Sequence, residues 1–273
     1  MTEAERKQII ALVQREVVPA IGCTEPIAVA LCVAKATETL GAKPEKIDVL
    51  LSANILKNAM GVGIPGTGMI GLPIAIALGA LIGKSEYQLE VLKDSNPAAV
   101  EEGKRFIGEK RIDISLKKNI TEKLYIEVCC KSGGNKATAI IAGGHTTFIY
   151  IARNGDVLLN KQSAGCGEEE AQVAGLTLRK VYDFAMNAPL VEIRFILDSA
   201  RLNKAAAERS FDGNYGHGLG RMLRGNYEHK ILGDSVFSHI LSYTSGACDA
   251  RMAGAMIPVK SNSGSGNQGI SAT

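Results

Sequence analysis

The chain has 273 residues, of which 46% are hydrophobic and 22% charged, and this balance argues against an intrinsically disordered protein. Its 31 basic and 28 acidic residues give a net charge of only +3, and no dense run of lysine or arginine is present. Nucleic acid is therefore not the expected partner, and the absence of tryptophan together with 5% aromatic content also removes stacking platforms for single strands. We expect a globular protein with a sizeable core.

The N-terminal residues and the cysteines indicate the compartment. The first residues are polar and charged, and no apolar signal segment follows them. We expect a cytoplasmic, reducing location, where cysteines are thiols or metal ligands and do not form a disulfide framework. The six are Cys23, Cys32, Cys129, Cys130, Cys166 and Cys248.

Residues 58–83 carry no charge and raise the question of a membrane span. Their continuous apolar part, residues 70–82, is shorter than the roughly 20 residues that a span requires. We therefore expect a buried helix behind a glycine loop, and no membrane partner.

Cap signals predict the N-terminal helices. Thr2 and Glu5 form a capping box that starts the first helix. Thr24 caps a second helix that ends at Gly41, which places Cys23 at a helix N-terminus. Residues 47–55 are typical of a strand, and residues 96–108 of a helix with a first-turn proline.

From Arg111 onward apolar residues alternate with a period of two, which predicts half-buried strands. A Gly133-Gly134 turn follows, and Asn154-Gly155 between two apolar runs is a strong hairpin signal. We therefore expect an antiparallel meander over residues 111–160.

Helical patterns return after Gly167, over residues 168–186, from Leu190, and over residues 235–256. The predicted fold is α+β, with an antiparallel sheet covered by helices on one face and followed by a mainly helical segment. We divide it into residues 1–110, 111–165 and 166–273, as parts of one catalytic unit.

Two glycine-rich segments are candidate ligand loops. Residues 61–66 fit the G-x-G-x-x-G pattern, but five residues separate them from the preceding strand and Pro65 lies inside the motif. This argues against a dinucleotide site and favours a loop that closes over a small ligand or packs tightly. Residues 261–269 offer hydroxyls, carboxamides and backbone amides for a small anion, although a Gly/Ser linker has a similar composition.

Cysteine and histidine chemistry leaves several interpretations open. Cys32 and Cys130 fit the core, whereas a helix N-terminus favours the thiolate form of Cys23, which binds metals or attacks substrates. A structural thiol is the competing interpretation for Cys23, and Cys166 is the second candidate. His145 follows Gly143-Gly144 at a strand end, a position that suits either a catalytic or a turn histidine.

The order of several motifs along the whole chain resembles the L-cysteine desulfidase family, which is similar to the iron–sulfur L-serine dehydratase alpha subunits. The blocks that carry the resemblance are residues 22–26 (GCTEP), 54–58, 65–69, 89–94, 143–146 (GGHT), 194–203, 249–252 (DARM) and 261–269.

The resemblance implies a β-elimination lyase that converts L-cysteine to pyruvate, ammonia and hydrogen sulfide, or alternatively L-serine to pyruvate and ammonia. It also implies an oxygen-sensitive [4Fe-4S] cluster as Lewis acid. Cys23 matches the family's N-terminal cluster cysteine, and the remaining cysteine ligands are expected beyond residue 273. The chain thus looks like the N-terminal part of a longer enzyme and is expected to be inactive alone.

The same resemblance implies site residues. Arg251 is expected to bind the substrate carboxylate through a bidentate contact, and the α-proton is expected to go to Lys57 or His145. The polar groups of the amino acid are assigned to Asn262, Ser263, Ser265 and Asn267.

Two rival functions stay open. One is a pyridoxal-phosphate lyase with Lys57 or Lys260 as the Schiff base. The other is a non-catalytic amino-acid or anion sensor. The sequence does not choose between cysteine and serine, nor between a monomer and a homo-oligomer, although apolar surface left where more polypeptide should pack would promote association.

Overall fold

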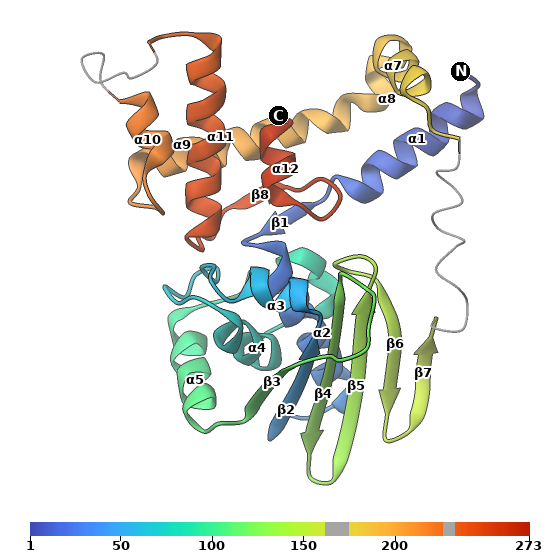
Figure 1. Ribbon diagram of the computed structural model, residues 1–273, viewed down its shortest axis with the longest axis vertical. Coiled ribbons are helices and arrows are strands. Elements are labelled where there is room, and N and C mark those ends of the chain that lie inside the picture. The colour runs from blue at the N-terminus through green and yellow to red at the C-terminus, as the bar shows by residue number, and fades with distance from the viewer. Residues whose placement is uncertain (162–174, 226–232) are drawn as a thin grey trace.

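The computed structural model describes residues 1–161, 175–225 and 233–273, which form two groups of secondary structure stacked along the long axis (Figure 1). The lower group is a six-stranded sheet with helices on one face, and the upper group is mainly helical and holds both termini. A short antiparallel pair, β1 (Pro19–Ile21) with β8 (Pro258–Lys260), lies where the groups meet. The predicted α+β class, with a mainly helical segment after the sheet, is confirmed.

The six-stranded sheet has the order β3-β2-β4-β5-β6-β7. Strands β4 to β7 form the predicted antiparallel meander. The prediction was wrong for β3, which pairs in parallel with β2, because three helices and a 3₁₀ turn lie between these strands and allow the crossover that a parallel pair needs. The strands are β2 (Lys46–Leu51), β3 (Ile112–Leu116), β4 (Tyr125–Ser132), β5 (Asn135–Ala142), β6 (Phe148–Arg153) and β7 (Asp156–Asn160).

Both predicted turns of the meander are present. Asn154 and Gly155 have φ of 52° and 100°, and Gly133 and Gly134 have φ of 53° and 80°. Consecutive left-handed residues give the twist that joins adjacent antiparallel strands.

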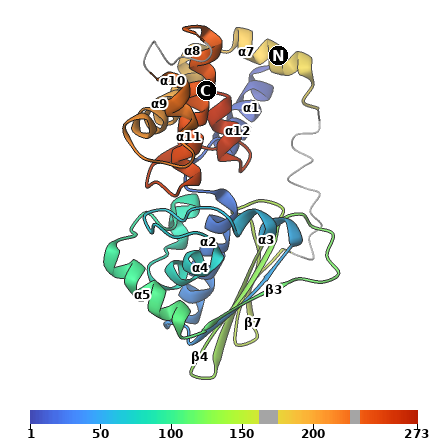
Figure 2. The same ribbon diagram turned by 60° about the vertical axis from the view of Figure 1, so that its left-hand side comes forward.

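The helices of the lower group cover one face of the sheet, as the turned view shows most clearly (Figure 2). The core lies between that face and α2, whose Leu31 and Cys32 are fully buried, and continues to α4. The predicted strand over residues 47–55 is too long: it ends at Leu51, and Ser52 caps a helix instead. The helices are α2 (Thr24–Leu40), α3 (Ala53–Ala59), α4 (Leu72–Leu81), the 3₁₀ helix η1 (Ser85–Glu90) and α5 (Pro97–Gly108).

The expected buried apolar helix is α4, and the glycine loop before it packs tightly. The backbone N–H groups of Gly63 and Gly66 donate to the carbonyl oxygens of Met252 and Gly254 in the upper group, at 3.0 Å each. A Cβ on Gly63 would clash with the backbone of Ala253, so this loop joins the two groups. In the described ranges, no helix combines the length and the apolarity needed to cross a bilayer.

The upper group consists of helices contributed by both ends of the chain. The predicted helix over residues 168–186 falls partly outside the described residues, and its described part begins at Leu178. The helix predicted over residues 235–256 ends at Met252, before Gly254 with its φ of 79°. The helices are α1 (Glu3–Glu16), α7 (Leu178–Asn187), α8 (Leu190–Ile193), the 3₁₀ helix η2 (Arg194–Ile196), α9 (Leu197–Asp212), α10 (Leu219–Arg224), α11 (Val236–Met252) and α12 (Gly266–Ser271).

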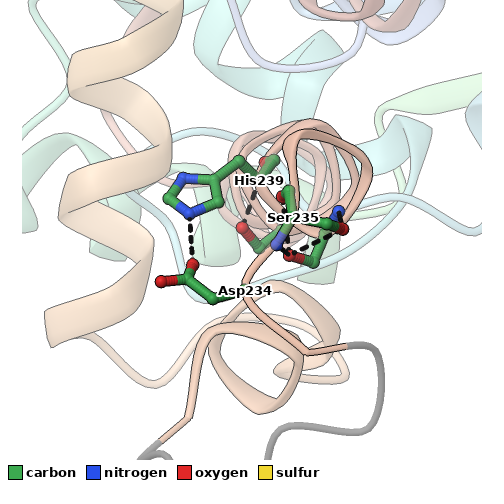
Figure 3. Close-up of polar contacts among 5 residues, drawn as sticks. Asp234, Ser235 and His239 are labelled. Carbon is green, nitrogen blue, oxygen red and sulfur yellow. Dashed lines mark hydrogen bonds and ion pairs between the residues drawn. The ribbon is translucent and has the colours of Figure 1, made fainter.

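Helix α11, which carries Arg251 at its far end, is fixed at its start by polar side chains (Figure 3). Ser235 and Ser238 form a capping box, in which each side-chain oxygen accepts from the backbone N–H of the other residue. One turn later, the His239 ring lies 2.8 Å from Asp234 Oδ1.

Residues 261–269 do not form a linker. The N–H and hydroxyl of Ser261 both donate to the carbonyl oxygen of Val18 at 2.9 Å, and the N–H of Ser263 donates to that of Glu16. The buried Asn203 accepts from the Lys260 N–H at 2.8 Å and donates to Gly269 O at 3.1 Å. Backbone bonding to the segment that links α1 to α2 holds this loop in a defined position.

Candidate functional site

A cavity of about 290 Å³ lies where the two groups meet, close to the lower end of the range of small-ligand sites. The N-terminus of α2, α3 and the loop after β5 line it from the lower group. The end of α11 and the loop before α12 line it from the upper group. The lining residues are Cys23, Thr24, Glu25, Asn58, His145, Arg251, Met252, Ser263, Gly264, Ser265 and Asn267.

Cys23 is the N-cap residue of α2, and its thiol donates to Glu25 Oε2 at 3.0 Å. Burial first, and then the negative charge of Glu25, raise the pKa of this thiol to about 12, and the positive charge of Arg251 only partly opposes them. Of the two interpretations open for Cys23, the thiolate is therefore contradicted in the chain without a metal, because desolvation and the adjacent carboxylate outweigh the helix dipole. At neutral pH, Cys23 is a protonated hydrogen-bond donor.

Glu25 accepts hydrogen bonds from three neutral donors: the Cys23 thiol, the Thr24 hydroxyl at 3.1 Å and the Asn58 carboxamide at 3.4 Å. Burial acts to raise the pKa of Glu25, but the thiol hydrogen bond, its own backbone N–H, His145 and Thr24 together lower it below its ordinary value. The side chain is consequently a carboxylate at neutral pH. Among the described residues it has no cation within ion-pair distance.

Arg251 is buried, with 4% of its surface exposed. Its Nη1 donates to Asn267 Oδ1 at 2.8 Å and lies 3.6 Å from the sulfur of Met252. Its Nε is buried without a hydrogen-bond partner, and no carboxylate of the described residues pairs with the guanidinium. A buried charge is ordinarily paired, so a guanidinium without an ion-pair partner among the described residues points to an anionic ligand.

The His145 ring has no hydrogen-bond partner among the described side chains and backbone groups. Burial lowers the pKa of His145 below its ordinary value, and the positive charge of Arg251 adds to this, while Glu25 acts in the opposite direction. The imidazole is therefore neutral at pH 7 and has a free nitrogen that can accept a proton.

The loop between β8 and α12 needs its glycines. Ser263 and Gly264 have left-handed backbones, with φ of 47° and 73°. A Cβ on Gly264 would clash with Nδ1 of His145, and a Cβ on Gly266 would clash with Nε of Arg251. The missing side chains allow the loop to approach both functional groups.

The structure brings together six of the eight residues proposed for the site: Cys23, His145, Arg251, Ser263, Ser265 and Asn267. The other two do not line the cavity. Lys57 is exposed on α3, and Asn262 forms an isolated bridge with Ser265 and accepts from the Ser263 hydroxyl.

The cavity also contains residues that the sequence analysis did not assign to a site, chiefly Glu25 and Asn58. Both lie in blocks that the resemblance uses, residues 22–26 and 54–58. Their place in these blocks was the signal that the sequence offered for both residues.

The described residues do not by themselves provide an iron–sulfur site. A [4Fe-4S] cluster is held by three or four thiolates, whereas within the described ranges only Cys23 lines the cavity, and no group of three metal-ligating side chains occurs there. Cys248 does not line the cavity; its thiol donates to Asn267 Oδ1 at 3.5 Å, and burial raises the pKa of this thiol. Cys166 lies outside the described residues.

Comparison with known proteins places the chain among bacterial relatives. Residues 86–273, more than half of the chain, match the family model described as serine dehydratase alpha chain. The whole chain is 81% identical to a UPF0597 protein of Bacteroides fragilis, 77% identical to one of Bacteroides thetaiotaomicron and 51% identical to one of Porphyromonas gingivalis. It spans 64% of the length of each of these curated relatives.

No solved structure matches the chain with significance. The matched residues include those cavity-lining residues that come later in the chain, namely His145, Arg251 and the loop before α12. The chain therefore belongs to the serine dehydratase alpha chain family.

Proposed function

We propose that the cavity binds the carboxylate of a small amino acid, and that the whole protein eliminates the β-substituent of this amino acid. The observation that carries the proposal is the buried Arg251, whose guanidinium has an unsatisfied Nε and no carboxylate partner among the described residues. A ligand carboxylate supplies both the missing acceptor and the missing charge.

The elimination begins with removal of the α-proton. His145 is the preferred base, because its neutral ring lines the cavity, whereas Lys57 is exposed on α3. The Cβ–S bond of L-cysteine, or the Cβ–O bond of L-serine, then breaks to leave aminoacrylate. Hydrolysis of the derived imine gives pyruvate and ammonia, so that L-cysteine and water yield pyruvate, ammonia and hydrogen sulfide.

Two separate observations support L-serine and L-cysteine as the substrate. The description of the matched family names serine dehydratase, which supports L-serine as the substrate. The motif blocks resemble the L-cysteine desulfidases, which supports L-cysteine. Both amino acids have three carbons and one carboxylate, and a cavity of about 290 Å³ has room for either.

The iron–sulfur cluster is part of the proposal for the whole protein only. A cluster would act as a Lewis acid toward the leaving group. Cys23 would supply one thiolate, and the other thiolates would have to come from outside the described residues. A bound iron would also favour ionisation of the Cys23 thiol, whose raised pKa keeps it protonated without one.

The test is pyruvate release from L-cysteine and L-serine, assayed without oxygen after supplying iron and sulfide, in a protein of the length of the curated relatives. Arg251→Lys keeps the charge but loses the planar fork, and we expect KM to rise about tenfold or more. Arg251→Ala should raise KM further. An unchanged KM in both variants would remove Arg251 from the substrate site. A pyridoxal-phosphate enzyme would instead show a cofactor band that iron chelators leave unchanged.

A further inference from the structure

The cavity is lined by one cationic and one anionic side chain. Arg251 and Glu25 both line it, and neither forms an ion pair with the other or with any other described side chain. Both side chains therefore face one space of about 290 Å³.

The unused hydrogen-bonding positions of Glu25 and Arg251 fit different ligand groups. The carboxylate of Glu25 has about four acceptor positions, three of which are taken by neutral donors. The guanidinium of Arg251 has an unused N–H donor at Nε. A simple carboxylic acid would satisfy Arg251 and leave Glu25 facing a like charge. A simple amine would satisfy Glu25 and leave Arg251 buried without an anion.

Building on the proposed function, we infer that Glu25 binds the α-ammonium group of the substrate, so that Glu25 and Arg251 together select a zwitterionic α-amino acid over acids that lack the amine. Glu25 is thus a specificity-determining residue. The hydrogen bonds from Thr24 and Asn58, and from the Cys23 thiol while it is protonated, hold its carboxylate at the helix N-terminus. The ammonium then contributes the cation that these neutral donors do not provide.

Isothermal titration calorimetry of this chain with L-serine and with glycerate, in which a hydroxyl replaces the ammonium, tests the inference. We expect the unmodified chain to bind L-serine about tenfold or more tightly than glycerate, because a charge-assisted hydrogen bond is lost with the amine. Glu25→Gln should weaken L-serine binding by a similar factor and leave glycerate binding unchanged or improved. Glu25→Asp keeps the charge and should retain part of the preference.

Glu38→Gln is the matched control, since it removes one carboxylate from the same helix at a position bonded to Ser85 and not to the cavity. It should leave the preference for L-serine intact. Equal binding of serine and glycerate by the unmodified chain would overturn the role of Glu25 and leave the carboxylate site at Arg251 standing. Equal weakening of both ligands by Glu25→Gln would show a structural role only. Binding of neither ligand by the unmodified chain would overturn the inference together with the carboxylate site at Arg251 on which it rests, whereas the elimination itself is tested by pyruvate release in the longer protein.

Discussion

The two groups of secondary structure differ in how they bury apolar side chains. In the lower group, α2 and α4 pack with the sheet in one continuous core, in which Leu31 and Ile76 are fully buried. In the upper group, the corresponding cluster is small, and large side chains remain exposed, for example 86% of Leu178 and 81% of Leu190. The small cluster consists of Ala206, Ala207, Ala247, Val259 and Ile270.

This contrast implies that the lower group determines the stability of the chain, whereas both groups are needed to assemble the site. Buried apolar area supplies most of the favourable free energy of folding, so the lower group should determine the stability of the described chain. The upper group contributes Arg251 and the loop before α12, and reaches the lower group through the bonds of Gly63 and Gly66. We therefore expect the same chemical change to have different consequences in the two groups.

The largest difference should come from truncating a leucine in each group. Leu31→Ala removes a side chain from the core and should lower the free energy of unfolding by about 2–5 kcal/mol. Leu178→Ala removes a side chain that is already in water and should change it by less than about 0.5 kcal/mol. Urea unfolding followed by circular dichroism measures both, and similar losses would show that the helical group is as tightly packed as the core.

A second pair of variants tests the contact between α2 and α4. A Cβ on Gly79 would lie 2.6 Å from the carbonyl oxygen of Ala30, so Gly79→Ala should push the helices apart and cost about 1–3 kcal/mol. Gly108 at the end of α5 has open space around it, and Gly108→Ala should be neutral or stabilise by up to about 1 kcal/mol. Thermal unfolding of the two variants gives the comparison, which would fail if Gly79→Ala were tolerated equally well.

Features with a local cause could be predicted from the sequence. The Thr2 capping box, the end of α2 at Gly41 and the Asn154-Gly155 hairpin each depend on residues within a few positions of one another. The parallel partner of β3 could not be predicted in this way, because it depends on the path of the chain between two distant strands. The end of β2 at Leu51 was missed because the apolar pattern continues into α3 through Ile55, a core residue on a helix.

In the site, too, local features could be predicted from the sequence, whereas features that depend on the fold could not. Motif blocks indicated Cys23, His145 and Arg251 separately, but only the fold brings them to one cavity. The sequence left both a thiolate and a structural thiol open for Cys23, because the pKa of this thiol depends on burial and on Glu25 more than on the helix N-terminus. The exposure of Lys57 depends on which face of a short helix meets the core, which one sequence does not reveal for seven residues.

The junction between the groups should be sensitive to the glycines of the loop before α12. In Gly266→Ala, the new methyl group displaces the guanidinium of Arg251, and we expect L-serine to bind about tenfold more weakly. Gly61→Ala is the control, since Gly61 has no atom near its missing side chain. Calorimetric titration of both variants measures the effect. Unchanged affinity in Gly266→Ala would mean that the position of Arg251 does not limit binding.

The smallest effect should be the contribution of His145 to the pH dependence of stability. Its pKa in the folded chain lies below the ordinary value of 6.5, first because of burial, so the unfolded chain binds a proton more readily at this residue. The free energy of unfolding should therefore fall as the pH drops from 6.5 through the lower folded pKa, and His145→Gln should remove this part of the loss. Proton NMR of the histidine C2–H signals, with His145→Gln to assign the resonance, gives the folded pKa directly. A midpoint at or above 6.5 would mean that the imidazole is not desolvated at the junction.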